Sequence, residues 1–221
     1  HRRGGGVIIA VDGPAASGKG TLARRLAAHY RLAHLDTGSL YRATALRVLA
    51  GGGDPANADK AAAAARAVTA ADLADPRLRQ DDVAAAASVV AAIPAVRAAL
   101  LTFQRDFARH PPAGLRGAVL DGRDIGTVVC PEADAKLFIT ASLEARAHRR
   151  YKELQAAGAG AIYERVLQDM KVRDERDSER QAAPLKAADQ SKLIDTTALD
   201  ADAAFAAAVE FIAGKRAVPD P

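Results

Sequence analysis

Short β-branched runs alternate with amphipathic stretches along the chain. The first run, over residues 7–11, leads into a glycine-rich turn, which is the pattern of a buried strand. In the next stretch Leu22, Leu26 and Tyr30 recur at every fourth position and predict a helix over residues 19–31 with one apolar face. Because strands separated by helices pair in parallel, the chain is predicted to be α/β, with helices on both faces of a parallel sheet. Further strands are expected at residues 32–36, 118–120, 135–140 and 192–195.

Alanine-rich segments predict most of the helices. The chain has 55 alanines among its 221 residues, and alanine is the strongest intrinsic helix former. An irregular stretch is expected over residues 73–80, where Asp75-Pro76 interrupts the pattern. In the second half, Ser142 is expected to cap a helix that Gly158 breaks. The remaining helices are expected from a Thr37-Gly38-Ser39 cap to about residue 50, and at residues 58–72, 81–92, 95–108, 143–157, 162–180 and 201–213.

Composition and charge exclude several classes of function. The 31 basic residues exceed the 27 acidic ones by only four, and both kinds are interleaved over residues 146–180, so no continuous track for nucleic acid is expected. The single cysteine, Cys130, excludes a disulfide within the chain and a cysteine-rich zinc site. No apolar run reaches the roughly 20 residues of a membrane span, and no signal-peptide pattern precedes the first strand. We therefore expect a cytoplasmic protein that binds neither membranes nor nucleic acid.

The turn after the first strand has the composition of a phosphate-binding loop. In such a P-loop, backbone N–H groups converge on phosphate oxygens at the N-terminus of a helix. Lys19 would supply a charge for the outer phosphates, and the Thr21 hydroxyl can ligate Mg²⁺. Gly20 stands between them, one residue more than in the common spacing. The turn predicts binding of a nucleoside triphosphate, and the chain lacks the N-K-x-D motif of GTPases. Its residues are Gly13, Pro14, Ala15, Ala16, Ser17, Gly18, Lys19, Gly20 and Thr21.

Three more motifs follow at intervals along the chain. DTGSLYR covers residues 36–42 after the second expected strand, and DGRDIGTVV covers residues 121–129 after the third. In the charged helix, RDERDSER covers residues 173–180 and is followed by APL at residues 183–185. With the P-loop before them, these motifs in this order resemble those of the bacterial cytidylate kinases. The similarity extends over about residues 7–213.

The resemblance implies both a fold and a reaction. The fold is that of a P-loop kinase, a three-layer αβα arrangement with a five-stranded parallel sheet, a helical monophosphate-binding insert and a short lid. The reaction is transfer of the γ-phosphoryl group of ATP to CMP or dCMP with Mg²⁺, carried out by a monomer. The segment around residues 73–80 is shorter here than in many members of the family, which leaves the architecture of the insert open. The implied boundaries are a core at about 7–38, 117–148 and 190–214, an insert at about 39–110 and a lid at about 150–176.

The resemblance also implies site residues, position by position. The P-loop, Arg149 and Arg150 would bind ATP, with Thr21 as the Mg²⁺ ligand. The catalytic groups would be Lys19, Arg123 and Arg180. CMP would be bound at its phosphate by Arg42, Arg123 and Arg180 with Thr37 beside them, at its cytosine by Ser88, Arg97 and Asp124, and at its ribose by Arg173 and Asp177.

The chemistry of these residue types fits the implied roles. Phosphoryl transfer needs fixed positive charges, and a planar guanidinium binds phosphate oxygens bidentately. Asp124 and Ser88 would accept hydrogen bonds from the amino group of cytosine, and Arg97 would donate to its N3. Uracil presents the opposite polarity at both positions, so such a pocket would discriminate against it.

Other interpretations stay open on the residues alone. Arg173, Asp177 and Arg180 share one helical stripe, which also fits an exposed face with ion pairs. Ser88 stands in an alanine run and also fits a simple helix position, and Asp36 fits a helix cap as well as a partner of the magnesium site. The alternative functions are an adenylate- or shikimate-type kinase and a nucleotide-dependent binding protein whose ATP site only switches its shape.

Overall fold

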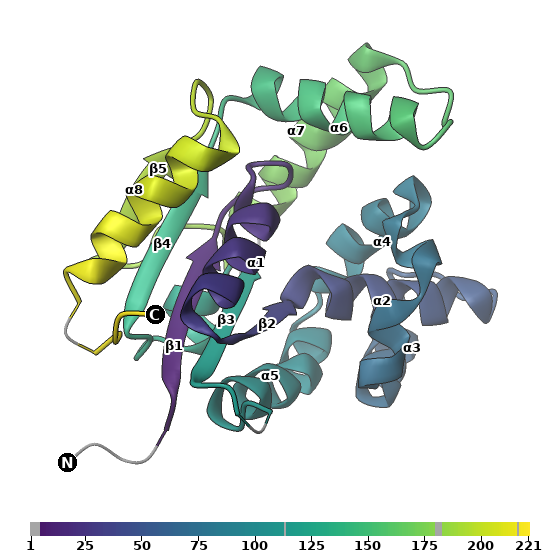
Figure 1. Ribbon diagram of the computed structural model, residues 1–221. Helices are drawn as coiled ribbons and strands as arrows, with labels where there is room; N and C mark the ends of the chain where they lie inside the picture. The colour runs from purple at the N-terminus through teal and green to yellow at the C-terminus, as the bar shows by residue number, and fades with distance from the viewer. Residues whose placement is uncertain (1–4, 113, 180–182, 216) are drawn as a thin grey trace.

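Five parallel strands form a single sheet in the order β2-β3-β1-β4-β5 (Figure 1). The structure is a computed structural model, which describes residues 5–112, 114–179, 183–215 and 217–221. The predicted parallel α/β fold is therefore confirmed. The strands are β1 (Val7–Asp12), β2 (Ala33–Asp36), β3 (Gly117–Gly122), β4 (Ala135–Thr140) and β5 (Lys192–Asp195).

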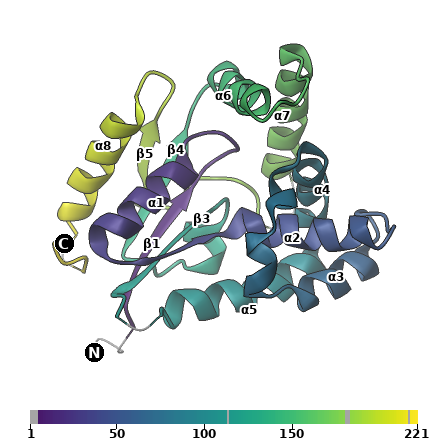
Figure 2. The same ribbon diagram turned by 45° about the vertical axis from the view of Figure 1, so that its right-hand side comes forward.

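Helices cover both faces of the sheet because successive residues of a strand point to opposite sides. Ile9 and Val11 of β1 belong to the core formed with α1 (Lys19–Tyr30) and α8 (Ala201–Ala213). Ile8 and Ala10 belong to the core formed with α5 (Pro94–Arg109) and its neighbours. Figure 1 shows α1 and α8 over one face, and Figure 2 shows α5 under the other, so the three-layer arrangement is confirmed.

In the described part of the chain, four helices follow β2 and precede β3, and they are called the inserted helices here (Figure 2). The predicted helix over residues 58–72 is wrong at its end, because the helix stops at Ala67. Thr69 and Asp72 form a reciprocal cap that begins a new turn, and this local hydrogen bonding competes with continuation of the helix. The inserted helices are α2 (Thr37–Ala50), α3 (Ala58–Ala67), α4 (Asp81–Ala91) and α5, and two 3₁₀ turns, Ala70–Ala74 and Pro76–Arg79, lie between α3 and α4.

No single helix among the described residues is long and apolar enough to cross a membrane. Taken together, α4 and α5 have the required length and composition, but the two helices meet at a bend of 100°.

A helical pair between β4 and β5 lies across the carboxyl edge of the sheet (Figure 1). It consists of α6 (Leu143–Ala156) and α7 (Tyr163–Glu179). Ser142 caps α6 as predicted, since its hydroxyl accepts a hydrogen bond from the Ala145 N–H at 3.1 Å. Gly158 follows the end of α6 with a φ of +75°, a conformation that favours glycine, and so breaks the helix where expected.

Candidate active site

Three cavities lie in a row at the carboxyl edge of the sheet, and a fourth, between α4 and α7, adjoins the central one at Arg150 and Met170. Parallel sheets bind ligands outside this edge, and the register brings Asp12 of β1 beside Gly122 of β3. The central cavity, of about 230 Å³, is lined by the P-loop and by residues of the inserted helices, α6 and α7. The inner pocket, of about 40 Å³, shares Arg42 and Arg123 with it. The outer pocket, of about 240 Å³, shares Ser17, Gly18 and Thr21 with it, so the three form one row.

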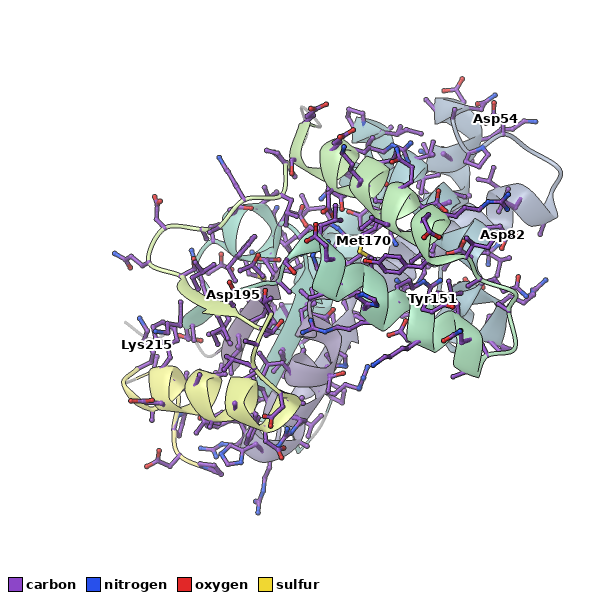
Figure 3. All side chains as sticks on the ribbon, turned by 90° about the horizontal axis from the view of Figure 1, so that it is seen from above. Asp54, Asp82, Tyr151, Met170, Asp195 and Lys215 are labelled. Atoms are coloured by element: carbon purple, nitrogen blue, oxygen red, sulfur yellow. The ribbon has the colours of Figure 1, made fainter. Side chains whose placement is uncertain are left out.

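The central cavity lies between the core and the inserted helices. Its lining includes Lys19 of α1, Ala84 of α4 and Met170 of α7, and Figure 3 labels Met170 among the side chains seen from above. Elements from three separate parts of the sequence therefore meet around this cavity.

The P-loop is held tightly against β4. A Cβ atom on Gly13 would stand 2.1 Å from the carbonyl oxygen of Ile139, so only glycine fits at this position. Gly18 takes a φ of +94°, and α1 begins at the next residue. The side chain of Ser17 is buried, and its hydroxyl has no hydrogen-bond partner among the described residues. The loop therefore presents polar groups that a bound anion could satisfy.

The charged form of Lys19 is disfavoured by its surroundings in the central cavity. Its Nζ donates only one long hydrogen bond, of 3.4 Å, to the carbonyl oxygen of Pro14. Burial, followed by the nearby charge of Arg123, lowers the pKa of Lys19 to about 8, although Asp121 and Asp36 act in the opposite direction. An anion bound beside the ammonium group would relieve both effects.

The three residues implied for cytosine recognition lie together in the inner pocket. Arg97 donates to the carboxylate of Asp124 and, at 3.1 Å, to the carbonyl oxygen of Ala91. Ser88 lines the same pocket, and its buried hydroxyl has no partner among the described residues. The inner pocket thus combines an ion pair with an uncommitted hydroxyl.

The residues implied for the phosphate and ribose of CMP lie between the inner pocket and the central cavity. Arg42 donates to Asp36 at 2.7 Å, and Arg123 donates to Asp177. The Nε atoms of Arg42 and Arg173 are buried without a partner in the described part of the chain. Burial, followed by the charge of Arg123, lowers the pKa of Arg173 to about 10. These guanidinium groups are crowded and only partly satisfied, which favours binding of an anion.

The two other residues implied for the CMP phosphate are Thr37 and Arg180. The Thr37 hydroxyl donates to the carbonyl oxygen of Asp121 at 2.8 Å, although the residue lines the inner pocket. Arg180 lies outside the described residues.

Asp36 does not act as the helix cap that its position suggested. It occupies the N-cap position of α2, but its carboxylate bonds to Ser39 and Arg42 instead of the helix backbone. Thr37-Gly38-Ser39 is part of the helix and not its cap, because α2 begins at Thr37. Burial alone would raise the pKa of Asp36, but the charges of Arg42 and Lys19 outweigh it and lower the pKa to about 2.

Arg149 and Arg150 face different cavities. Arg149 lines the outer pocket and donates to the Ala16 carbonyl oxygen of the P-loop at 3.2 Å and to Thr196. Arg150 lines the central cavity, where it pairs with Asp81 of α4 at 3.1 Å.

Sequence reasoning missed two residues that organise this site. Arg146 is buried and joins the P-loop carbonyl oxygen of Ala15, at 3.4 Å, to Asp174 of α7, at 2.6 Å. Thr196 donates to the Ser17 carbonyl oxygen at 2.7 Å and lines the outer pocket. Thr196 could have been found, since it follows the last parallel strand, but Arg146 carried no local signal among 23 arginines.

The carboxylate of Asp12 connects the strand before the P-loop to the turn that contains Asp124. It accepts the N–H groups of Ile125, at 2.9 Å, and Gly126, at 2.8 Å. These residues begin a π-helical turn, Ile125–Val129, that the hydrophobic pattern did not predict. Burial raises the pKa of Asp12 to about 7 despite the two hydrogen bonds. The strand that leads into the P-loop and the turn that lines the inner pocket are therefore joined by one buried carboxylate.

Comparisons with known proteins identify the family. The family model of cytidylate kinase matches residues 9–213. The chain is 61% identical to the cytidylate kinase of Paramagnetospirillum magneticum, over 95% of this chain and 99% of that protein. It is 58% identical to the cytidylate kinase of Rhodospirillum rubrum, over 95% and 98%. A crystal structure of an uncharacterised protein from Eubacterium ventriosum is similar in fold, with a TM-score of 0.53, 15% identity, and coverage of 95% of this chain and 99% of that one. The family match decides against an adenylate- or shikimate-type kinase, and the chain belongs to the cytidylate kinase family.

Proposed function

We propose that the protein transfers the γ-phosphoryl group of ATP to CMP or dCMP and releases ADP with CDP or dCDP. The observation that carries this proposal is that the inner pocket and the central cavity share Arg42 and Arg123. Two nucleotides seated in these cavities would meet with their phosphates at the shared arginines. In-line transfer requires such a placement of donor and acceptor.

The ATP side uses the central cavity and the outer pocket. The triphosphate would bind the N-terminus of α1 and Lys19, where the helix dipole and the ammonium group favour negative charge. The outer pocket, which adjoins the P-loop at Ser17 and Thr21, would receive the base. Arg149 lines that pocket and would contact the base or ribose.

The CMP side uses the inner pocket and its neighbouring arginines. Arg42, Arg123 and Arg173 would hold the monophosphate and neutralise the charge that develops during transfer. The reaction needs no protein nucleophile, because a phosphate oxygen of CMP attacks the γ-phosphorus directly. Ser88, Arg97 and Asp124 would select cytosine through the polarity of their hydrogen bonds.

Magnesium fits the central cavity as a companion of the ATP phosphates. The described residues contain no group of three or more His, Cys, Asp or Glu side chains that could hold a metal. This agrees with Mg²⁺, which takes most of its ligands from phosphates and water in such sites. The Thr21 hydroxyl, which lines the cavity, would be the protein ligand, and bound Mg²⁺ would neutralise charge on the phosphates.

The division into core, insert and lid belongs to the same proposal. Water must be excluded from the γ-phosphoryl group, so the lid at about residues 150–176 would close over the central cavity. The ion pair of Arg150 with Asp81 supports this assignment, because it already joins the lid to the inserted helices. The monomeric state stays a prediction.

A panel of nucleoside monophosphates tests the reaction. With ATP and Mg²⁺, ADP release should be fast with CMP and dCMP, slow with UMP and absent with AMP. ATP binding without turnover on any monophosphate would support a nucleotide-dependent switch instead, and a preference for AMP would contradict the proposed reading of the base.

Replacing Ser88 by Ala should separate stability from binding. The unpartnered buried hydroxyl costs the fold free energy, so S88A should leave the free energy of unfolding unchanged or raise it by up to about 1 kcal/mol. Loss of one hydrogen bond to cytosine should weaken CMP binding roughly 5- to 10-fold. Chemical denaturation and calorimetry with CMP measure the two effects.

Ser142 provides the matched control for this substitution. S142A removes the cap of α6, so it should destabilise the fold by about 1 kcal/mol and leave CMP affinity unchanged. Equal CMP affinity in S88A and the wild type would remove Ser88 from the proposed cytosine contacts.

A further inference from the structure

The segment before α4 places an unassigned arginine at the central cavity. Leu78 is buried in the core of the inserted helices and anchors the 3₁₀ turn Pro76–Arg79. The next residue, Arg79, is exposed and lines the central cavity together with Lys19 and Thr21. The backbone of this turn is thus fixed by packing, while its last side chain faces the proposed triphosphate site.

Arg79 differs from its basic neighbours in having no partner in the described part of the chain. Arg77, on the same turn, pairs with Asp75 at 2.8 Å, and Arg47 pairs with Asp72 at 3.0 Å. No hydrogen bond or ion pair joins Arg79 to any described residue. The turn therefore presents an uncommitted guanidinium to the cavity.

The central cavity has an excess of positive charge, which favours binding of an anion. Seven basic side chains line it against three acidic ones. Arg42, Arg123 and Arg150 are held by Asp36, Asp177 and Asp81. Among the remaining cations, Lys19 and Arg173 both have lowered pKa values, because burial and neighbouring positive charge disfavour their protonated forms. A bound polyphosphate would compensate this excess, and Arg79 is placed to share it.

We propose that Arg79 is a further phosphate-binding residue for ATP, contributed across the central cavity by the 3₁₀ turn that precedes α4. The proposal rests on the proposed function, since it assigns the ATP triphosphate to this cavity. The inner pocket does not include Arg79 among its described lining residues, so the contact concerns ATP and not CMP. An arginine from this turn that binds ATP would also link seating of the donor to the position of the CMP-binding helices.

The test compares R79Q, R79K and the matched control R77Q with the wild type. Calorimetry measures the affinity of each protein for ATP and for CMP, and a coupled assay measures kcat and both KM values. R79Q should bind ATP or turn it over roughly 10- to 100-fold less well, the effect of losing one charge-assisted hydrogen bond. Its CMP affinity should stay within about twofold, R79K should recover part of the loss, and R77Q should match the wild type.

The outcomes separate this inference from the proposed function. An active wild type with R79Q equal to R77Q overturns the role of Arg79 and leaves the kinase activity standing. A parallel loss of ATP and CMP affinity in R79Q, or a thermal midpoint below that of R77Q, indicates a structural role and also overturns the inference. A wild type inactive on CMP contradicts the proposed function, while ATP affinity in the variants still tests the contact.

Discussion

Replacing Lys19 by Gln should lower kcat roughly 100- to 1,000-fold, the loss typical of removing one fixed charge or donor that stabilises a transition state. Lys19 lies in the central cavity with only one long hydrogen bond, so its ammonium group is free to contact the transferring phosphoryl group. Glutamine keeps much of the length and polarity of the side chain but removes the charge. Single-turnover kinetics with saturating ATP and CMP measure the effect on chemistry.

The pH dependence of ATP binding gives a second, independent measure of Lys19. Its pKa in the free protein is lowered to about 8 by burial and by Arg123, so the lysine loses its charge as the pH rises above 8. A bound polyphosphate favours the protonated form and raises this pKa, so ATP affinity should fall by up to about tenfold per pH unit above 8. In K19Q this decrease should disappear.

Lys152 provides the control for both measurements, because it is an exposed residue of α6 that lines none of the three cavities. K152Q should retain the kcat and the pH profile of the wild type. A K19Q protein that turns over at the wild-type rate would remove the ammonium group from the proposed mechanism.

Asp124→Asn is the second substitution with a large expected effect, and it acts on the choice of base. The carboxylate only accepts hydrogen bonds and so fits the amino group of cytosine, whereas the asparagine amide can also donate to O4 of uracil. The ratio of kcat/KM for CMP to that for UMP should therefore fall roughly 100-fold. Because both substrates are measured on the same preparation, the ratio does not depend on the fraction of folded protein.

The same substitution should also destabilise the fold. Asp124 and Arg97 are 4% and 9% exposed and form an ion pair, so D124N leaves a buried guanidinium without its counter-charge. Removing one partner of such a pair costs about 3–5 kcal/mol. Denaturant unfolding of D124N measures this loss.

Asp72→Asn is the matched control, since it breaks the ion pair with Arg47, which is more exposed and lies away from the three cavities. It should cost no more than about 1 kcal/mol and leave the base preference unchanged. An unaltered CMP to UMP ratio in D124N would show that cytosine is read by other groups.

The sequence predicted the helices and strands well where a short segment carries a clear hydrophobic or alanine-rich pattern. The strands at residues 135–140 and 192–195 and the helix at 201–213 have the expected bounds. In the strand at 135–140 buried positions alternate, and the helix is rich in alanine, so both carry their own periodicity. The π-helical turn Ile125–Val129 was not predictable in this way. Its first two N–H groups are bound by Asp12, 113 and 114 residues away in the chain.

For the candidate site, the sequence likewise predicted the residues better than their contacts. The motifs indicated which residues to examine, and the fold brings Arg42, Ser88, Arg97, Asp124 and Asp177 to one pocket. Arg42 pairs with Asp36 of its own motif, but the other partners were not predictable, because those ion pairs join residues far apart in the chain. Arg123 of the β3 turn thus meets Asp177 of α7, 54 positions later.

The sequence by itself determined the alternation of strands and helices, the glycine-rich turn that ends at α1, and the family to which the chain belongs, because these depend on neighbouring residues or on the order of motifs. Only the tertiary structure decided which charges are neutralised and which remain uncommitted. The sheet order β2-β3-β1-β4-β5 gathers strand ends from across the chain at one edge, and burial there determines which charges find partners. Arg42 and Arg123 are thereby paired with carboxylates, whereas Lys19 and Arg79 face the central cavity without an ion-pair partner among the described residues.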